Sequence, residues 1–465
     1  MRVLKLVPWR AFLYYLFTGL ILIGPALMNM YPLVYSDSGT YMASSRHLYA
    51  PIDRPIGYGL IIRAVTWQST MWTVVIFQGM VASWLVRECL RTLFPTLRNA
   101  WRPHVLVLVV LLIGTSLPWY TSQLMPDVLS GFLALCFFLL LFGRQLAFGK
   151  TILLWVLLFF FTITHLSYIP MMIAAALLTV IAAWRWGRAP RRKRLRLTLT
   201  GLLALPLIGS VFIMYTNRQE GNGWVLSPTS SLFLSGKLIE SGAMRLHLER
   251  VCRTAPNFLC AHLDELNTTG MHYVWDDDAP TRQGLGLVDA SKRLDPLVSE
   301  VLSDPRNWPM LIWSSCIATA SQTAQVDVGS GLGPYREGSA PYHPMLHDLP
   351  HELPNYMNSL QQRGVLSFEA INFVARPVLL GALACLLTLW PSCRRTRWWA
   401  FCMVMIGFVV LNAAATGALA NLYDRLQARI TWLVIFAALL LVLQRFQWAR
   451  ALFLFPTSGG SRNSG

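Results

Sequence analysis

Charged residues are scarce in this chain of 465 residues: only 13% are Asp, Glu, Lys or Arg, whereas 55% are hydrophobic and the mean hydropathy is +0.47. Soluble globular domains carry about 25% charged residues, so this composition excludes an ordinary water-soluble protein. Many apolar runs are long enough to cross a bilayer, which takes ~20 helical residues. The 18 Trp, 23 Phe and 15 Tyr suit a protein that meets lipid interfaces. The sequence predicts an α-helical polytopic membrane protein.

The sequence also lacks nucleic-acid motifs, zinc-ligand spacings and clear internal repeats. A net charge of +17 without a binding motif does not indicate nucleic acid, and we interpret it as basic residues facing the anionic cytoplasmic leaflet. We therefore expect no nucleic-acid partner. The absence of repeats and the few charges inside the apolar runs argue against a transporter.

About ten transmembrane helices are expected, at residues 11–30, 70–88, 104–120, 127–143, 151–164, 167–184, 197–215, 377–391, 399–420 and 427–445. Lys and Arg concentrate in alternate loops, so the positive-inside rule places both termini in the cytoplasm. The sequence around His165 and Pro170 interrupts residues 151–184, and we expect a tight hairpin there. Without a small-residue cleavage site after it, the first run is interpreted as an uncleaved anchor.

Three parts are expected along the chain. Residues 1–215 form an N-terminal transmembrane module whose first outer loop, 31–69, carries the chemistry. Residues 216–376 are polar and rich in turn residues, which predicts a mainly helical extracytoplasmic domain; its apolar segment 308–313 is expected in the domain core rather than on the membrane surface. Residues 377–465 form a C-terminal transmembrane module and a cytoplasmic tail. Cys252 and Cys260 are candidates for a disulfide on an oxidising side.

Ionisable residues gather at the predicted outer face. Asp37 follows the first apolar run, and Arg54 comes 17 residues later. Such groups near a membrane are costly unless they are functional or paired. A carboxylate can remove a proton from an acceptor hydroxyl, and arginines bind phosphate with paired hydrogen bonds. The predicted catalytic residues are Asp37 and Asp127, and the predicted substrate-binding residues are Arg54, Tyr58, His165, Arg425 and Arg429.

Each of these residues also has a structural interpretation. Asp37 and Asp127 would stabilise helix N-termini, as acidic residues often do. Arg54 and Arg429 would anchor the chain at lipid headgroups, His165 would satisfy backbone groups in the hairpin, and Tyr58 would belong to an aromatic belt. Residues 276–278 are three consecutive Asp, which we interpret as a surface turn rather than a metal site.

Several of these features together resemble the GT-C superfamily of membrane glycosyltransferases. They are Asp37 in the first outer loop, Arg54-Pro55, Pro126-Asp127 at the start of the fourth span, and the large late outer domain. The resemblance includes the protein O-mannosyltransferases and the lipid A aminoarabinose transferases. It covers the architecture of residues 1–200 and, more loosely, the last spans.

The resemblance implies a polyprenyl-phosphate sugar donor, Asp37 as general base, donor-facing positions within 423–429, and a glycan, lipid or protein acceptor. Many relatives have a second acid beside the first-loop Asp, whereas Ser36 and Ser38 flank Asp37. No cofactor is therefore certain, and a divalent metal ion stays open. A bacterial inner membrane with a periplasmic site is the expected location, and the endoplasmic reticulum is the alternative. A multispan transporter or a non-catalytic envelope assembly factor is the alternative function.

Overall fold

A computed structural model describes residues 9–97, 100–143, 146–185, 193–266, 270–394 and 396–445. Within these ranges all regular secondary structure is helical, and the one β-bridge joins Leu33 to Gln123. Most of the basic run at 185–196 and the predicted cytoplasmic tail lie outside the described residues.

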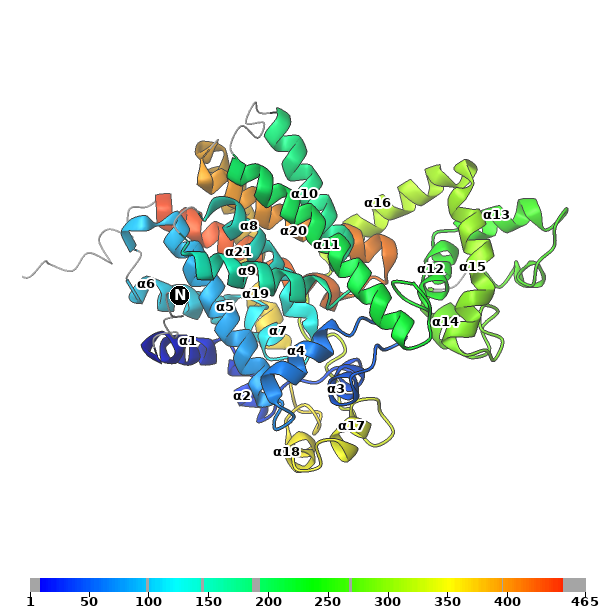
Figure 1. Ribbon diagram of the computed structural model, residues 1–465, viewed down its shortest axis with the longest axis horizontal. Coiled ribbons are helices and arrows are strands. Elements are labelled where there is room, and N and C mark those ends of the chain that lie inside the picture. The colour runs from blue at the N-terminus through cyan, green and yellow to red at the C-terminus, as the bar shows by residue number, and fades with distance from the viewer. Residues whose placement is uncertain are drawn as a thin grey trace, which may run out of the picture.

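The N-terminal part of the chain forms α1 (Trp9–Ile21), α2 (Gly24–Asn29), α3 (Ser38–His47), α4 (Gly57–Thr66), α5 (Trp72–Leu93), η1 (Pro95–Leu97), α6 (Arg102–Gly114), α7 (Leu117–Thr121), η2 (Pro126–Val128), α8 (Leu129–Phe142), α9 (Phe148–Thr162), α10 (Tyr168–Arg185) and α11 (Lys193–Gln219). The middle part forms α12 (Ser230–Glu240), α13 (Ala243–Val251), η3 (Cys260–His262), α14 (Gly270–Trp275), α15 (Leu287–Ser303), η4 (Pro305–Asn307), α16 (Trp308–Ala324), α17 (Tyr342–His347) and α18 (Leu353–Asn358). The last part forms α19 (Glu369–Leu389), η5 (Trp390–Cys393), α20 (Arg397–Leu419) and α21 (Asp424–Arg445) (Figure 1).

The prediction of a helical multi-pass membrane protein is confirmed. Among the described residues, six helices are long and apolar enough to cross a bilayer: α5, α10, α11, α19 with η5, α20 and α21. A helix lies at each of the ten expected positions, but α6, α8 with η2, and α9 are shorter apolar helices, and the first run is divided into α1 and α2. The expected hairpin is present as α9 and α10, which are separated by residues 163–167.

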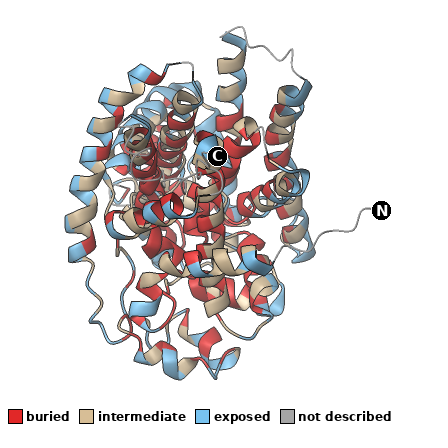
Figure 2. Ribbon diagram, turned by 90° about the vertical axis from the view of Figure 1, so that its left-hand side faces the viewer, coloured by how far each residue is buried: buried red, intermediate tan, exposed pale blue. Residues whose placement is uncertain are grey.

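Close backbone contacts hold the bundle together. A Cβ atom on Gly19 of α1 would lie 2.7 Å from the Met80 nitrogen, and a Cβ on Gly79 of α5 would lie 2.6 Å from the Gly19 carbonyl oxygen. Small residues allow such approaches where lipid gives no hydrophobic drive for helix association. Buried residues fill the centre of the bundle, and exposed residues lie around its outside (Figure 2).

The connections between helices divide into two sets at opposite ends of the bundle. At one end, Lys150 pairs with Glu88 at 2.6 Å, and the Arg397 guanidinium donates to the Thr92 carbonyl at 3.3 Å. These residues belong to the loops that the sequence assigns to the cytoplasm. The loops assigned to the outer face meet one another at the other end and build the site described below.

Residues 216–376 separate into two structural parts. The helices α12–α15 share a small core of their own and stand apart from the bundle on the right of Figure 1. Residues 325–368 instead pack onto the first outer loop and the start of α5: Gln361 Nε2 donates to the Val34 carbonyl at 2.5 Å, and the Met71 N–H donates to Glu352 at 3.1 Å. The second part therefore covers the loop that carries Asp37.

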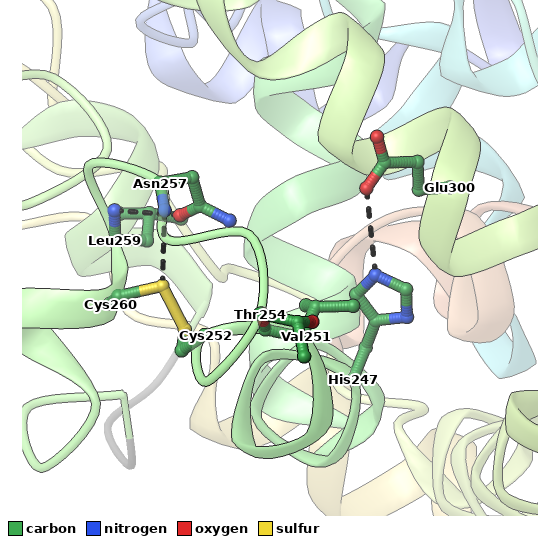
Figure 3. Close-up of a disulfide and its surroundings, with 8 residues drawn as sticks. All are labelled: His247, Val251, Cys252, Thr254, Asn257, Leu259, Cys260 and Glu300. Atoms are coloured by element: carbon green, nitrogen blue, oxygen red, sulfur yellow. Dashed lines mark hydrogen bonds and ion pairs between the residues drawn. A yellow bond between two sulfur atoms is a disulfide. The ribbon is translucent and has the colours of Figure 1, made fainter.

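Cys252 and Cys260 form a disulfide at the edge of the α12–α15 unit, with their Cα atoms 5.7 Å apart (Figure 3). The disulfide closes the short turn after α13, where the Asn257 N–H also points to the Cys260 sulfur at 3.2 Å. On α13 itself, His247 lies 3.7 Å from Glu300 of α15 (Figure 3). These contacts fasten α13 and its following turn to the rest of the unit.

Of the segment 308–313, which was expected in the domain core, Leu311 packs against the core of the α12–α15 unit, whereas the other five residues are exposed. Only Ala318 and Gln322 of α16 are buried, whereas Ile312 is 64% exposed and Trp313 is 68% exposed. The helix packs against α20, so that a Cβ on Gly417 would lie 2.7 Å from the Ala318 carbonyl oxygen. An apolar segment within a polar region fits a protein core and a membrane surface equally well, so the sequence alone does not distinguish the two.

Candidate functional site

Asp37 lies at the N-cap position of α3, but its carboxylate makes no capping hydrogen bond. One carboxylate oxygen lies 3.1 Å from Arg54 Nη1, and the other lies 3.2 Å from Arg425 Nη1. The side chain is 27% exposed, so it is accessible to a second molecule. The capping interpretation of Asp37 therefore does not account for this carboxylate, which joins two cations instead.

The two arginines come from distant parts of the chain. Arg54 belongs to the loop before α4 and also binds Asp53, with Nη2 at 2.5 Å from Oδ2, and its guanidinium lies 5.3 Å from the centre of the Tyr41 ring. Arg425 opens α21, and its guanidinium lies 3.9 Å from the centre of the Tyr35 ring. Aromatic faces attract cations, so each ring helps to hold its arginine beside Asp37.

The charge of Asp37 follows from these neighbours. Burial alone raises the pKa of a carboxyl group, but the positive charges of Arg54 and Arg425 outweigh it and lower the pKa of Asp37 below its ordinary value. Asp37 is thus ionised at neutral pH. An ionised carboxylate is the form that accepts a proton.

A second ion pair lies deeper. Arg429 Nη1 is 2.9 Å from Asp127, and the two side chains are 0% and 2% exposed. Arg429 Nη2 donates to Asn412 Oδ1 at 2.9 Å, and Asn412 donates in turn to Gln427 at 2.9 Å. This network ties the start of α8 to α20 and α21. It lies one turn of α21 away from Arg425, so it fixes where Arg425 stands.

His165 packs against Tyr168, whose ring lies beside Arg429, and Tyr58 packs against Tyr41, whose ring lies beside Arg54. His165 Nδ1 accepts the Ser167 backbone N–H at 3.2 Å, so the ring is held in the break between α9 and α10. Burial and the charge of Arg429 lower the pKa of His165. Tyr58 is fully buried: its hydroxyl donates to Gln78 at 2.9 Å, and its ring packs edge-on to Tyr41.

A cavity of about 420 Å³ opens beside the first outer loop, and Asp53, the partner of Arg54, is one of its lining residues. Its lining residues are Thr40, Tyr49, Ala50, Pro51, Ile52, Asp53, Glu220, Asn222 and Leu287. Glu220 accepts the Ala50 N–H at 3.2 Å, which closes one wall. The lining has two carboxylates and no basic side chain.

Sequence reasoning missed the residues that hold this site. Tyr35 supports Arg425 from below, and Gly331 packs against Tyr35 so closely that a Cβ there would lie 1.8 Å from the ring. Gly331 has a φ of +75°, which only glycine adopts without strain. The run at 329–333 has three glycines and so the composition of an ordinary loop, and no local signal links it to Tyr35.

No group of three or more His, Cys, Asp or Glu side chains that could hold a metal ion occurs in the part of the chain that the structure describes. The acidic run at 276–278 does not converge: Asp276 binds His272 and Asp277 binds Arg282.

Comparison with family models, curated proteins and solved structures finds no match. The function therefore has to be argued from the site.

Proposed function

We propose that this protein is a membrane glycosyltransferase of the GT-C type, which moves a sugar from a polyprenyl-phosphate donor to an acceptor outside the cytoplasm. The observation that carries the proposal is the Asp37 carboxylate, which is partly exposed and lies between Arg54 and Arg425 at the end of a helical membrane bundle. A general base needs an exposed ionised group, and a phosphate leaving group needs nearby cations. This site combines both.

In the proposed reaction the acceptor hydroxyl attacks the anomeric carbon of the donor sugar. Asp37 takes the hydroxyl proton, the bond from the anomeric carbon to the phosphate oxygen breaks, and its electron pair leaves on the polyprenyl phosphate. Arg54 and Arg425 bind the developing negative charge. Arg425 Nε is buried and has no hydrogen-bond acceptor among the described residues, so one N–H donor of this arginine is unused by the protein.

The remaining predicted residues take supporting parts in this proposal. Asp127 and Arg429 are buried against each other, so we assign them to positioning α21 rather than to contact with substrate. Tyr58 supports Tyr41 and through it Arg54. His165 has a lowered pKa, so we assign it a neutral ring and no role in binding the donor phosphate by charge. No metal ion is needed for the step as written.

The proposed topology has ten transmembrane helices, with the α12–α15 unit and the Asp37 site on the periplasmic face of a bacterial inner membrane. The donor enters from the bilayer toward Arg425 at the start of α21. The acceptor approaches from the aqueous side through the cavity lined by Thr40, Asp53 and Glu220. Arg54 stands between the two routes because it contacts both Asp37 and Asp53.

The test is transfer of radiolabelled sugar from a panel of polyprenyl-phosphate donors by purified full-length protein. We expect transfer by the wild type and a loss on the order of 10²–10⁴ for Asp37→Asn, the range that general acid–base catalysis contributes. Asp278→Asn is the matched control. Asp278 is an exposed acid in the α12–α15 unit, so its substitution should leave transfer unchanged.

Equal activity of wild type and a folded Asp37→Asn variant would remove Asp37 from the mechanism. If no donor in the panel supports transfer, the transporter and assembly-factor alternatives become the better account.

A further inference from the structure

The helix α16 presents an apolar face to its surroundings. Its 17 residues include no charged side chain. Trp308 is 51% exposed, and Ile317 is 49% exposed, on the same outer side as Ile312 and Trp313. A contiguous apolar face of this kind on a protein marks contact with a membrane or a partner.

The position of α16 on the bundle indicates whether a membrane or a partner protein covers its apolar face. Met403, Val410 and Gly417 of α20 are seven positions apart, so they lie on one stripe of that helix. Met403 and Val410 are 41% and 49% exposed on a helix that is apolar and long enough to span a bilayer, so this stripe faces lipid. At Gly417 the same stripe is covered by Ala318 of α16. The helix α16 therefore rests on the lipid-facing side of α20, near the outer end of α20.

We propose that α16 is a membrane-embedded anchor: it lies in the interfacial layer of the bilayer, with its exposed apolar face in the acyl chains. A helix in this position has protein on one side and lipid on the other. Trp308 and Trp313 suit the level of the headgroups, where tryptophan is enriched. The helix α16 has 17 residues and is not among the helices that are long and apolar enough to cross a bilayer, which also suits a helix that lies in the interface.

The anchor connects the bilayer with the site. The C-terminal end of α16 is joined to the turn before α21, because Gln322 Nε2 donates to the Tyr423 carbonyl at 2.8 Å and Gln322 Oε1 accepts the Tyr423 N–H at 3.2 Å. The Asp327 N–H donates to Asp424 at 3.1 Å. Arg425 is the next residue. At its other end α16 continues directly from η4 and the α12–α15 unit, so the lipid contact holds that unit beside the bundle.

A native residue makes the proposal testable, because Cys316 is an exposed free thiol on the apolar face of α16. A nitroxide label on Cys316 in full-length protein, reconstituted in phosphatidylethanolamine–phosphatidylglycerol vesicles, reports its surroundings through collisions with oxygen and with nickel-EDDA. Cys385, the other accessible free cysteine, is changed to Ser in all samples. The control label is placed at Asp289→Cys in a Cys316→Ser background, because Asp289 is 71% exposed on α15.

We expect oxygen to relax the label at Cys316 several-fold more than nickel-EDDA, and the reverse at the control site. Stronger relaxation by nickel-EDDA at Cys316 would show a water-exposed face and overturn the proposal. Weak relaxation by both, with spin–spin broadening, would show a second copy of the chain on this face, and weak relaxation by both without broadening would show that the face is buried against the same chain; either result would overturn the proposal. A parallel melting curve identifies any label that disturbs folding, and labels at Ile312→Cys and Trp313→Cys then give the same reading from neighbouring positions.

Discussion

Asp37 and Arg425 lie 388 positions apart in the chain, yet their side chains meet at 3.2 Å. Asp37 belongs to the first outer loop, and Arg425 belongs to the first turn of the last helix. Their contact joins the two ends of the sequence at one face of the bundle. The site therefore exists only in the fully assembled chain.

The charge of Arg425 should set the acid limb of the activity profile. Burial raises the pKa of Asp37, but Arg54 and Arg425 together bring it below its ordinary value, so removing one positive charge raises it again. A base is lost as the pH falls through its pKa. In Arg425→Gln the rate should therefore begin to fall at a higher pH than in the wild type, on top of a lower plateau.

The measurement for this prediction is the pH dependence of kcat/KM for sugar transfer. Arg245→Gln is the control. Arg245 is an exposed arginine in the α12–α15 unit, so its loss should not change the pH dependence of kcat/KM. If the rate falls at the same acidic pH in Arg425→Gln and in the wild type, the charge of Arg425 does not lower the pKa of the catalytic base, and the prediction is wrong.

The buried pair of Asp127 and Arg429 should matter for stability more than for chemistry. Asp127→Asn leaves the Arg429 charge buried without its counterion, and breaking such a pair costs roughly 3–5 kcal/mol. The double variant Asp127→Asn with Arg429→Met should recover much of that loss, because no uncompensated charge is left. Thermal unfolding in detergent, followed by tryptophan fluorescence, compares the three proteins. Similar melting temperatures for wild type and Asp127→Asn would show that the pair is not structural.

Gly331 should tolerate no side chain. At its φ of +75° a non-glycine residue costs roughly 1–2 kcal/mol, and the added Cβ would lie 1.8 Å from the Tyr35 ring. Gly331→Ala should therefore lower the melting temperature and weaken donor binding by displacing the ring beneath Arg425. Gly333→Ala is the matched control two residues away, because nothing lies within 4 Å of a Cβ there. Equal behaviour of the two variants would contradict the support role of Tyr35.

The disulfide between Cys252 and Cys260 should stabilise the α12–α15 unit locally. A closed loop of this size removes unfolded-state entropy worth roughly 2–3 kcal/mol. Cys252→Ser should make this unit more sensitive to limited proteolysis while the bundle stays intact. Alkylation and mass spectrometry of the unreduced wild type, unfolded in denaturant, should leave Cys252 and Cys260 unmodified and label Cys316. Alkylation of all three before reduction would show that the disulfide does not form.

The sequence predicted the helical bundle well because long apolar runs have few alternatives to membrane helices. His165 and Pro170 correctly indicated the break between α9 and α10. The placement of Asp37, Arg54 and Arg425 on one face followed from the alternation of basic loops, and the structure brings all three into contact. The positive-inside rule applies to all short loops on one side of a membrane, so the distribution of Lys and Arg predicts which loops share a face.

Depth and tertiary partners could not be predicted in the same way. Nothing in the local sequence distinguishes Arg429, which is fully buried with Asp127, from Arg425, which reaches Asp37. The contact of Gly331 with Tyr35 depends on how residues 325–368 pack onto the first loop, which no periodicity encodes. The helix α16 was misplaced because its moderate apolarity fits a protein core and a membrane interface equally well.

The long separation between Asp37 and its second arginine also has a consequence for biogenesis. Synthesis proceeds from the N-terminus, so the first outer loop is made and inserted long before the last helix leaves the ribosome. During that interval Asp37 has Arg54 available as a partner but not Arg425. Insertion of α21 brings Arg425 to Asp37 and so completes the ion pairs of the first outer loop. A chain truncated before residue 425 would leave Asp37 without its second arginine.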